Sequence, residues 1–174
     1  HALAGRLWRT RVLDARVLEA LIDKPAEVTP GQMERWVRGF DNWAVCDSVC
    51  GCLFDRTPHA WDKAVEWTGR EEEYVKRAGF VLMATLAVHD KKAADERFEA
   101  FLPLLVQHAT DERNFVKKAV NWALRQIGKR NRRLNERAIR TAEEIRRFES
   151  RSARWIAADA LRELTSPKVQ ARLK

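Results

Sequence analysis

Apolar residues recur every three to four positions along almost the whole chain, and no stretch shows the strict alternation of a half-buried strand. This spacing places them on one face of an α-helix. We therefore predict helices over about residues 3–9, 11–23, 30–39, 42–54, 58–68, 71–89, 94–108, 113–128, 132–147 and 152–164. Three Thr/Ser-Pro pairs, Thr29-Pro30, Thr57-Pro58 and Ser166-Pro167, are typical helix starts.

A weak internal repeat accompanies this helical pattern. The segment 73–78 resembles 114–119 at an offset of 41, and 152–156 follows at a further 37. Because a helix-pair repeat of about 40 residues is the period of HEAT-like solenoids, we predict an all-α, HEAT-like α-solenoid of stacked antiparallel helix pairs. Residues 1–174 would form one domain, with Arg77, Lys118 and Trp155 in a ladder along its curved face. A plain helical bundle is the alternative.

The positive charge is concentrated in one part of the chain. The formal net charge is +8, yet residues 113–154 alone hold 14 Lys/Arg against 4 Asp/Glu, a local net of +10. This one-sided excess favours a polyanionic partner and a basic concave face. A protein-binding repeat scaffold fits so cationic a surface less well.

The three cysteines, Cys46, Cys50 and Cys52, are clustered and odd in number, which argues against a disulfide framework and for a reducing, cytoplasmic compartment. A metal cluster with His59 or Asp47 is the alternative, but the spacing is not that of paired zinc ligands. We expect no metal, no small-molecule cofactor, no membrane association and a monomer. The sequence opens at His1 within a helical pattern, so we expect residues to precede it.

Two helices carry candidate functional side chains. In residues 42–54, Trp43, Asp47, Cys50 and Phe54 fall on one side, and Val45, Val49, Cys52 and Leu53 on the other, predicted core side. Asp47 would then point outward beside an indole. An ordinary surface ion pair with an arginine is the alternative interpretation.

In residues 113–128, the side opposite the apolar face holds a tryptophan among cations: Lys118, Trp122, Arg125 and, just beyond, Lys129. An indole there is unusual unless something covers it. Stacking on a nucleotide is one interpretation, and packing beneath Lys and Arg stems is the other.

From about Leu13 onward, the chain resembles the DNA alkylation repair glycosylases of the HEAT-like AlkD type. The most specific segments are FDNWAVCDSVCG, EEYVKRAGFVLMA and NFVKKAVNWALRQIGKRN. The family's cleft tryptophan and aspartate match Trp43 and Asp47, its arginine in a VKR-type helix matches Arg77, and its later tryptophan and arginine match Trp122 and Arg125. Asn42 stands where the family usually has an aromatic residue, and the family normally begins with a further N-terminal helical segment.

The resemblance implies hydrolysis of the N-glycosidic bond of positively charged N3- and N7-alkylated purines in duplex DNA, in a bacterial cytoplasm at the nucleoid. Asp47 would stabilise the oxocarbenium-like sugar and orient water, and Trp43 and Trp122 would contact the nucleotide. The DNA backbone would be held by four cations, Arg77, Lys118, Arg125 and Lys129. A non-catalytic module that recognises altered DNA structure is the alternative.

Overall fold

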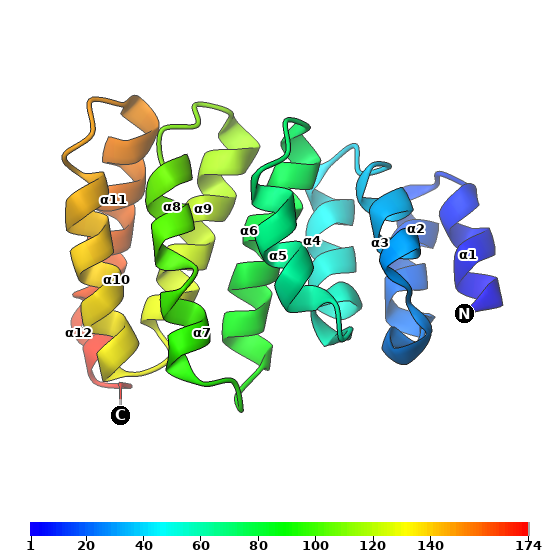
Figure 1. Cartoon of the computed structure of the whole chain (residues 1–174), viewed down its shortest axis with the longest axis horizontal. Coiled ribbons are helices and arrows are strands. Elements are labelled where there is room, and N and C mark those ends of the chain that lie inside the picture. The colour runs from blue at the N-terminus through cyan, green and yellow to red at the C-terminus, as the bar shows by residue number, and fades with distance from the viewer. Residues whose placement is uncertain (174) are drawn as a thin grey trace. The chain divides into compact units, whose positions relative to one another are not determined.

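The computed structural model describes residues 1–173, and these contain helices and no strand. In chain order the elements are α1 (Ala2–Arg9), α2 (Leu13–Ile22), η1 (Pro25–Glu27), α3 (Pro30–Val37), α4 (Trp43–Cys52), η2 (Phe54–Arg56), α5 (Ala60–Thr68), α6 (Glu73–His89), α7 (Asp95–Glu99), α8 (Leu102–His108), α9 (Asn114–Gly128), α10 (Arg132–Ile145), α11 (Arg151–Leu164) and α12 (Pro167–Gln170) (Figure 1). They group into two compact units, His1–Leu82 and Met83–Lys174. Helix therefore dominates, as the apolar periodicity predicts.

Two of the sequence predictions about helix limits are wrong. The single helix predicted over residues 94–108 is split into α7 and α8, because Pro103 lies in the first turn of α8 and cannot donate the hydrogen bond that a continuous helix requires. Thr57-Pro58 does not open α5. Thr57 ends η2, where its hydroxyl donates to the Phe54 carbonyl at 2.8 Å, and α5 begins at Ala60.

The other two predicted starts are confirmed. The Thr29 hydroxyl accepts from the Gln32 backbone N–H at 3.2 Å, and the Ser166 hydroxyl accepts from Val169 at 3.4 Å. These bonds satisfy amides that have no partner inside a helix. Short polar caps therefore fix where α3 and α12 begin.

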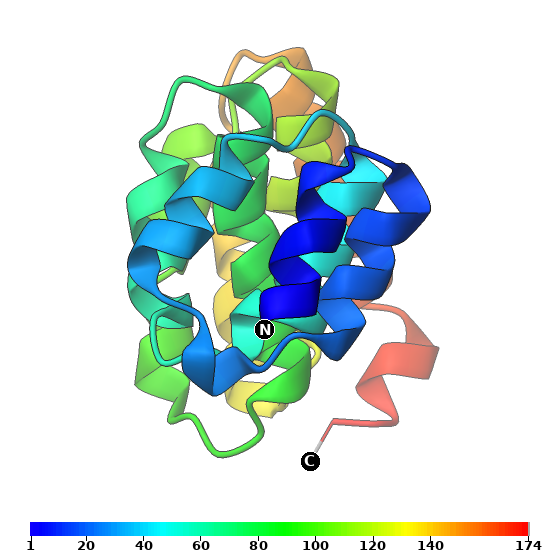
Figure 2. The same cartoon turned by 90° about the vertical axis from the view of Figure 1, so that its right-hand side faces the viewer.

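The core of the first unit is built largely from aromatic rings. Trp8 of α1 stacks on Trp36 of α3 with ring centroids 4.7 Å apart. The ring centroid of Phe54 lies 6.0 to 6.3 Å from those of Trp36, Phe40 and Trp67. Such rings bury large apolar areas, and their paired geometry adds further stabilisation. In Figure 2, α1 and α2 lie side by side.

The second unit is centred on α9, α10 and α11, which all pack against one another. Gly128, at the end of α9, lies close to residues of both α10 and α11. A Cβ added there would lie 2.7 Å from a Leu164 methyl group and 2.8 Å from the Ala138 Cβ. The three helices therefore depend on a residue without a side chain at this point.

Glu34 of α3 accepts hydrogen bonds from three side chains of the first unit. We expect it to make the free energy of unfolding depend on pH in the acidic range. Arg70 donates to it at 2.8 Å, Arg38 at 2.9 Å and the Trp67 indole at 3.2 Å. These bonds, that of Arg70 first, lower the pKa of Glu34 to about 2. Because this folded-state pKa lies below that of the unfolded chain, the contribution is present above about pH 5 and is lost as the pH falls towards 2.

The measurement is the free energy of unfolding of Glu34→Gln and the unaltered chain as a function of pH. Glu34→Gln should be less stable at neutral pH, and the two curves should converge towards pH 2. Glu27→Gln is the control, because Glu27 is paired with the exposed Lys24. A difference between the curves that is independent of pH would contradict this role of Glu34.

Candidate functional site

The first part of the predicted site is on α4, whose start is fixed by Asn42. The Asn42 side chain accepts from the Val45 backbone N–H at 3.0 Å, so the residue that stands in place of the family's aromatic is a helix cap. Trp43 is consequently the first residue of α4, and its side chain is 55% exposed. Asp47 follows one helical turn later.

The sequence prediction of the two sides of this segment is partly wrong. Val45, Val49 and Leu53 are buried as expected, but Cys50 and Phe54 are buried as well, and Cys52 is only partly covered. The reason is that α4 ends at Cys52 and a 3₁₀ turn follows, so helical periodicity does not extend to Phe54. Trp43 and Asp47 alone remain accessible from the four residues predicted to point outward.

Small side chains bring α4 close to α6. The Cys46 thiol lies 3.8 Å from the Tyr74 carbonyl oxygen, and the Cys50 thiol lies 3.9 Å from that of Ala78. The constant spacing of 28 residues means that the two helices run in the same direction. Buried cysteine acts here as a small apolar residue, and this close packing places Asp47 opposite α6.

On the side of α6 that faces α5, Gly79 allows the two helices to approach closely. A Cβ added at Gly79 would lie 2.9 Å from the Thr68 backbone nitrogen and 3.0 Å from the Ala64 carbonyl oxygen. Backbone cannot yield to such a contact as a flexible side chain can. The position of Arg77, two residues earlier, is therefore fixed from both sides of α6.

Arg77 forms a two-point ion pair with Asp47. Its Nε donates to Asp47 Oδ1 at 2.9 Å and its Nη2 to Oδ2 at 2.7 Å, a geometry that holds the carboxylate plane in one orientation. The Arg77 side chain is 7% exposed, whereas that of Asp47 is 22% exposed. The acid can therefore be reached from solvent, and the predicted contact of Arg77 with the DNA backbone would require the guanidinium to become more accessible than it is here.

Two opposing effects act on the Asp47 carboxyl. Burial raises its pKa above the usual value, and the hydrogen bonds and charge of Arg77 oppose that rise. Each carboxylate oxygen still has a lone pair after accepting from Arg77. The group can thus accept a hydrogen bond from water or face a developing positive charge.

The second part of the predicted site is on α9, in the other unit. Lys118 is exposed, Trp122 is partly exposed, and both lie on the side away from the α9 core residues. No ion-pair partner is recorded for Lys118 within residues 1–173. Its charge is therefore available to a polyanion.

Arg125 and Lys129 differ from Lys118, because both are paired with acids of α11. Lys129 donates to Glu163 at 2.6 Å, and Arg125 binds Glu163 and lies 3.6 Å from Asp159. Asp159 also accepts from the Asn121 amide at 2.7 Å. Our sequence reasoning missed these acids. The sequence did hold a signal for them: Asp159 follows Asn121, and Glu163 follows Arg125, by 38 residues, which is close to the repeat length.

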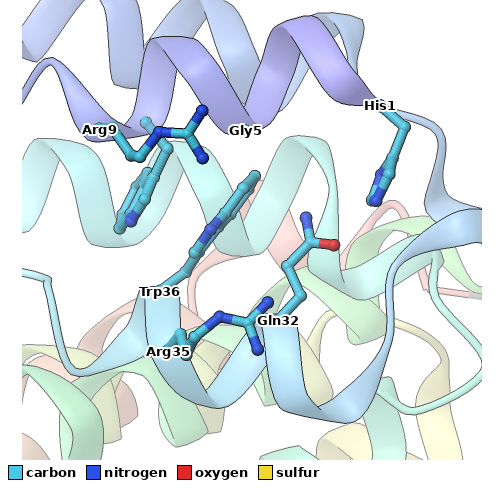
Figure 3. A pocket seen from close by; sticks show the side chains of 7 residues that line it. His1, Gly5, Arg9, Gln32, Arg35 and Trp36 are labelled. Atoms are coloured by element: carbon cyan, nitrogen blue, oxygen red, sulfur yellow. The ribbon is translucent and has the colours of Figure 1, made fainter.

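The cavity at α1 and α3 is separate from these residues. It has a volume of about 330 Å³ and is lined by His1, Gly5, Trp8, Arg9, Gln32, Arg35 and Trp36 (Figure 3). Trp43 and Asp47 are not among its lining residues. None of the site residues predicted from the sequence lines this pocket.

Comparison with known proteins identifies the family. The family model described as DNA alkylation repair enzyme matches residues 1–164. The chain belongs to this family. A solved structure, of a family related to the HEAT-like repeat DNA glycosylases with affinity for branched DNA structures, matches with a TM-score of 0.74 and 20% identity over 94% of this chain and 75% of that chain. Comparison with curated proteins finds no match.

The structural similarity confirms the predicted HEAT-like fold of this DNA alkylation repair family member. No helix described here is both long and apolar enough to cross a bilayer. Within residues 1–173, no group of three or more His, Cys, Asp or Glu side chains is arranged to hold a metal ion.

Proposed function

We propose that this member of the family is a monofunctional DNA glycosylase that hydrolyses the N-glycosidic bond of cationic N3- and N7-alkylated purines in duplex DNA. The observation that carries the proposal is the accessible Asp47 carboxylate, oriented by two hydrogen bonds from Arg77 and one helical turn from the exposed Trp43. Family membership supports the DNA repair context.

The proposed chemistry needs a negative charge beside the sugar more than it needs a proton donor for the leaving base. A cationic alkylpurine already leaves readily, so the C1′–N bond breaks with both electrons going to the base. Positive charge then develops on the sugar, and the Asp47 carboxylate stabilises it. Water adds to C1′ and its proton passes to Asp47 or to solvent. Trp43, and Trp122 on α9, would contact the cationic nucleotide through their ring faces.

The other candidate is a non-catalytic module that binds DNA of altered structure. One observation favours it: Arg77 neutralises Asp47 in the first unit, which weakens the field that a carboxylate alone would exert on a cation. The solved relative with affinity for branched DNA belongs to a related family. This function would require DNA binding without base release.

The deciding experiment is incubation of the chain with methylated duplex DNA, followed by chromatography of the released bases. Free 3-methyladenine and 7-methylguanine support the glycosylase. Salt-sensitive binding to the same DNA with no released base supports the binding module, because phosphate contacts weaken steeply as salt rises. Lack of binding at low salt would contradict both.

Glu163→Gln should increase DNA affinity if Arg125 and Lys129 contact the backbone as we propose together with Lys118. Glu163 holds both cations at present, so phosphate must compete with its carboxylate. Removing that charge should steepen the dependence of log affinity on log salt by about one for each cation released.

The measurement is fluorescence anisotropy of labelled duplex DNA over a series of salt concentrations. Glu149→Gln is the matched control, because it removes the same charge at an exposed position of the same unit. Equal gains in affinity for the two variants would mean that net charge alone matters, and Arg125 and Lys129 would lose their assignment as backbone contacts.

A further inference from the structure

The second unit presents an exposed indole that the proposed glycosylase chemistry does not use, and cations lie beside it. Trp155 of α11 is 41% exposed, although tryptophan carries a large apolar surface. The Lys117 ammonium of α9 lies 5.7 Å from its ring centroid. Arg151 is one helical turn before Trp155 and is exposed, as is Lys118. We call these four residues the Trp155 platform.

The register of α9 and α11 explains why these residues meet. Asn121 bonds to Asp159, and Arg125 bonds to Glu163, both at an offset of 38 residues. The same offset pairs Lys117 with Trp155. Our repeat alignment paired Lys118 with Trp155, which is one residue off. Side chains on the shared outer side of both helices therefore belong to one continuous surface.

Charge divides this surface into two parts. Towards the carboxyl ends of the helices, Arg125, Lys129 and Arg162 are paired with Asp159 and Glu163. Towards the amino ends, no ion pair is recorded for Lys117, Lys118 or Arg151 within residues 1–173. The platform thus keeps its positive charge, whereas the neighbouring cations are largely neutralised.

Two acids near the platform are already engaged. Asp159, one turn after Trp155, accepts from Asn121 at 2.7 Å and also binds Arg162. Glu112 accepts from the Ser150 hydroxyl at 2.9 Å and from the Ser152 backbone N–H at 3.2 Å. These bonds lower the pKa of Glu112 and keep it at the start of α11. The cations beside Trp155 therefore remain available to an anion.

We propose that the Trp155 platform binds an unpaired nucleotide of DNA, with the base stacked on the Trp155 indole and the flanking phosphates held by Lys117, Lys118 and Arg151. Bases inside a duplex are already stacked and show only their edges in the grooves. A base outside the duplex offers a ring face that an indole can contact, beside a backbone that cations attract. The platform therefore gives the protein a preference for DNA with single-stranded segments. This inference rests on the DNA-binding part of the proposed function and not on base hydrolysis.

The test compares two labelled probes by fluorescence anisotropy, a gapped duplex with unpaired nucleotides and the same duplex fully paired. Trp155→Ala should weaken binding to the gapped probe by about tenfold, the effect of losing one stacked base, and change binding to the paired duplex by less than about twofold. Trp155→Phe should restore part of the loss, because phenylalanine keeps a ring face. Lys118→Ala should weaken binding to both probes, since phosphates are common to them.

Arg162→Ala is the matched control. It removes a cation of α11 that is bound to Asp159. Binding to either probe should therefore weaken less than it does in Lys118→Ala. Equal losses on the two probes for Trp155→Ala, or no loss on either, would overturn the platform. Circular dichroism excludes unfolding as the cause. Release of methylated bases from paired DNA tests the glycosylase separately, so either proposal can fail while the other stands.

Discussion

Asp47→Asn should reduce release of 3-methyladenine and 7-methylguanine from methylated duplex DNA by about two to three orders of magnitude, the scale expected when one preorganised electrostatic group is lost. The substitution removes the negative charge and nearly preserves the shape of the side chain. It also turns one N–H₂ donor towards the Arg77 guanidinium, which can only donate. Base release by chromatography and DNA affinity by anisotropy are measured on the same preparations.

Affinity should change far less than base release, because Asp47 acts on the sugar and not on phosphates. Asp41→Asn is the matched control, since Asp41 is an exposed acid just before α4 and pairs at 3.4 Å with Arg16. It should release bases at the original rate. Equal activity of the unaltered chain and Asp47→Asn would refute the proposed role of this carboxylate.

The pH dependence of base release supplies a second test of Asp47. Only the ionised carboxylate stabilises positive charge, and burial raises the pKa of Asp47. Activity should therefore fall on the acid side at a higher pH than an exposed aspartate would give. An acid limb that is the same in the unaltered chain and Asp47→Asn would contradict this assignment.

Arg77→Ala should lower the free energy of unfolding by about 3 kcal/mol, because it leaves a largely buried carboxylate without its ionic partner. It should also reduce base release. Asp47 would lose the two hydrogen bonds that orient it, and loss of the Arg77 charge would raise its pKa further. The acid limb of the activity profile should then move to higher pH.

Arg77→Lys separates charge from geometry. Lysine retains the positive charge but cannot present two parallel N–H donors. It should keep the acid limb near its original position while activity remains reduced. The double variant Arg77→Ala/Asp47→Asn should be more stable than Arg77→Ala, since no charge is left unpaired. If Arg77→Ala weakens duplex binding strongly and leaves the acid limb unmoved, Arg77 is a backbone contact and not the residue that positions Asp47.

Sequence patterns were sufficient for the helical architecture and for part of the site. Apolar spacing located most helices, since the same period governs burial wherever the chain stays helical. It failed at Pro103 and at Phe54, where the helix breaks and the period no longer applies. The side of α4 that carries Trp43 and Asp47 followed from spacing, but the burial of Cys50 did not, because α6 covers it.

The amino-acid pattern alone was enough to predict the all-helical HEAT-like fold, the family, and the residues that carry charge and aromatic rings. Which of those charges are paired became clear only from the folded chain. Arg77 is bound to Asp47 across 30 residues, and Arg125 and Lys129 are bound to Glu163, whereas Lys117 and Lys118 have no such acidic partner among residues 1–173. The physical reason is that an ion pair depends on the distance between atoms on neighbouring helices. That distance is set by close contacts such as those of Cys46 and Gly128, which no pattern within one helix encodes.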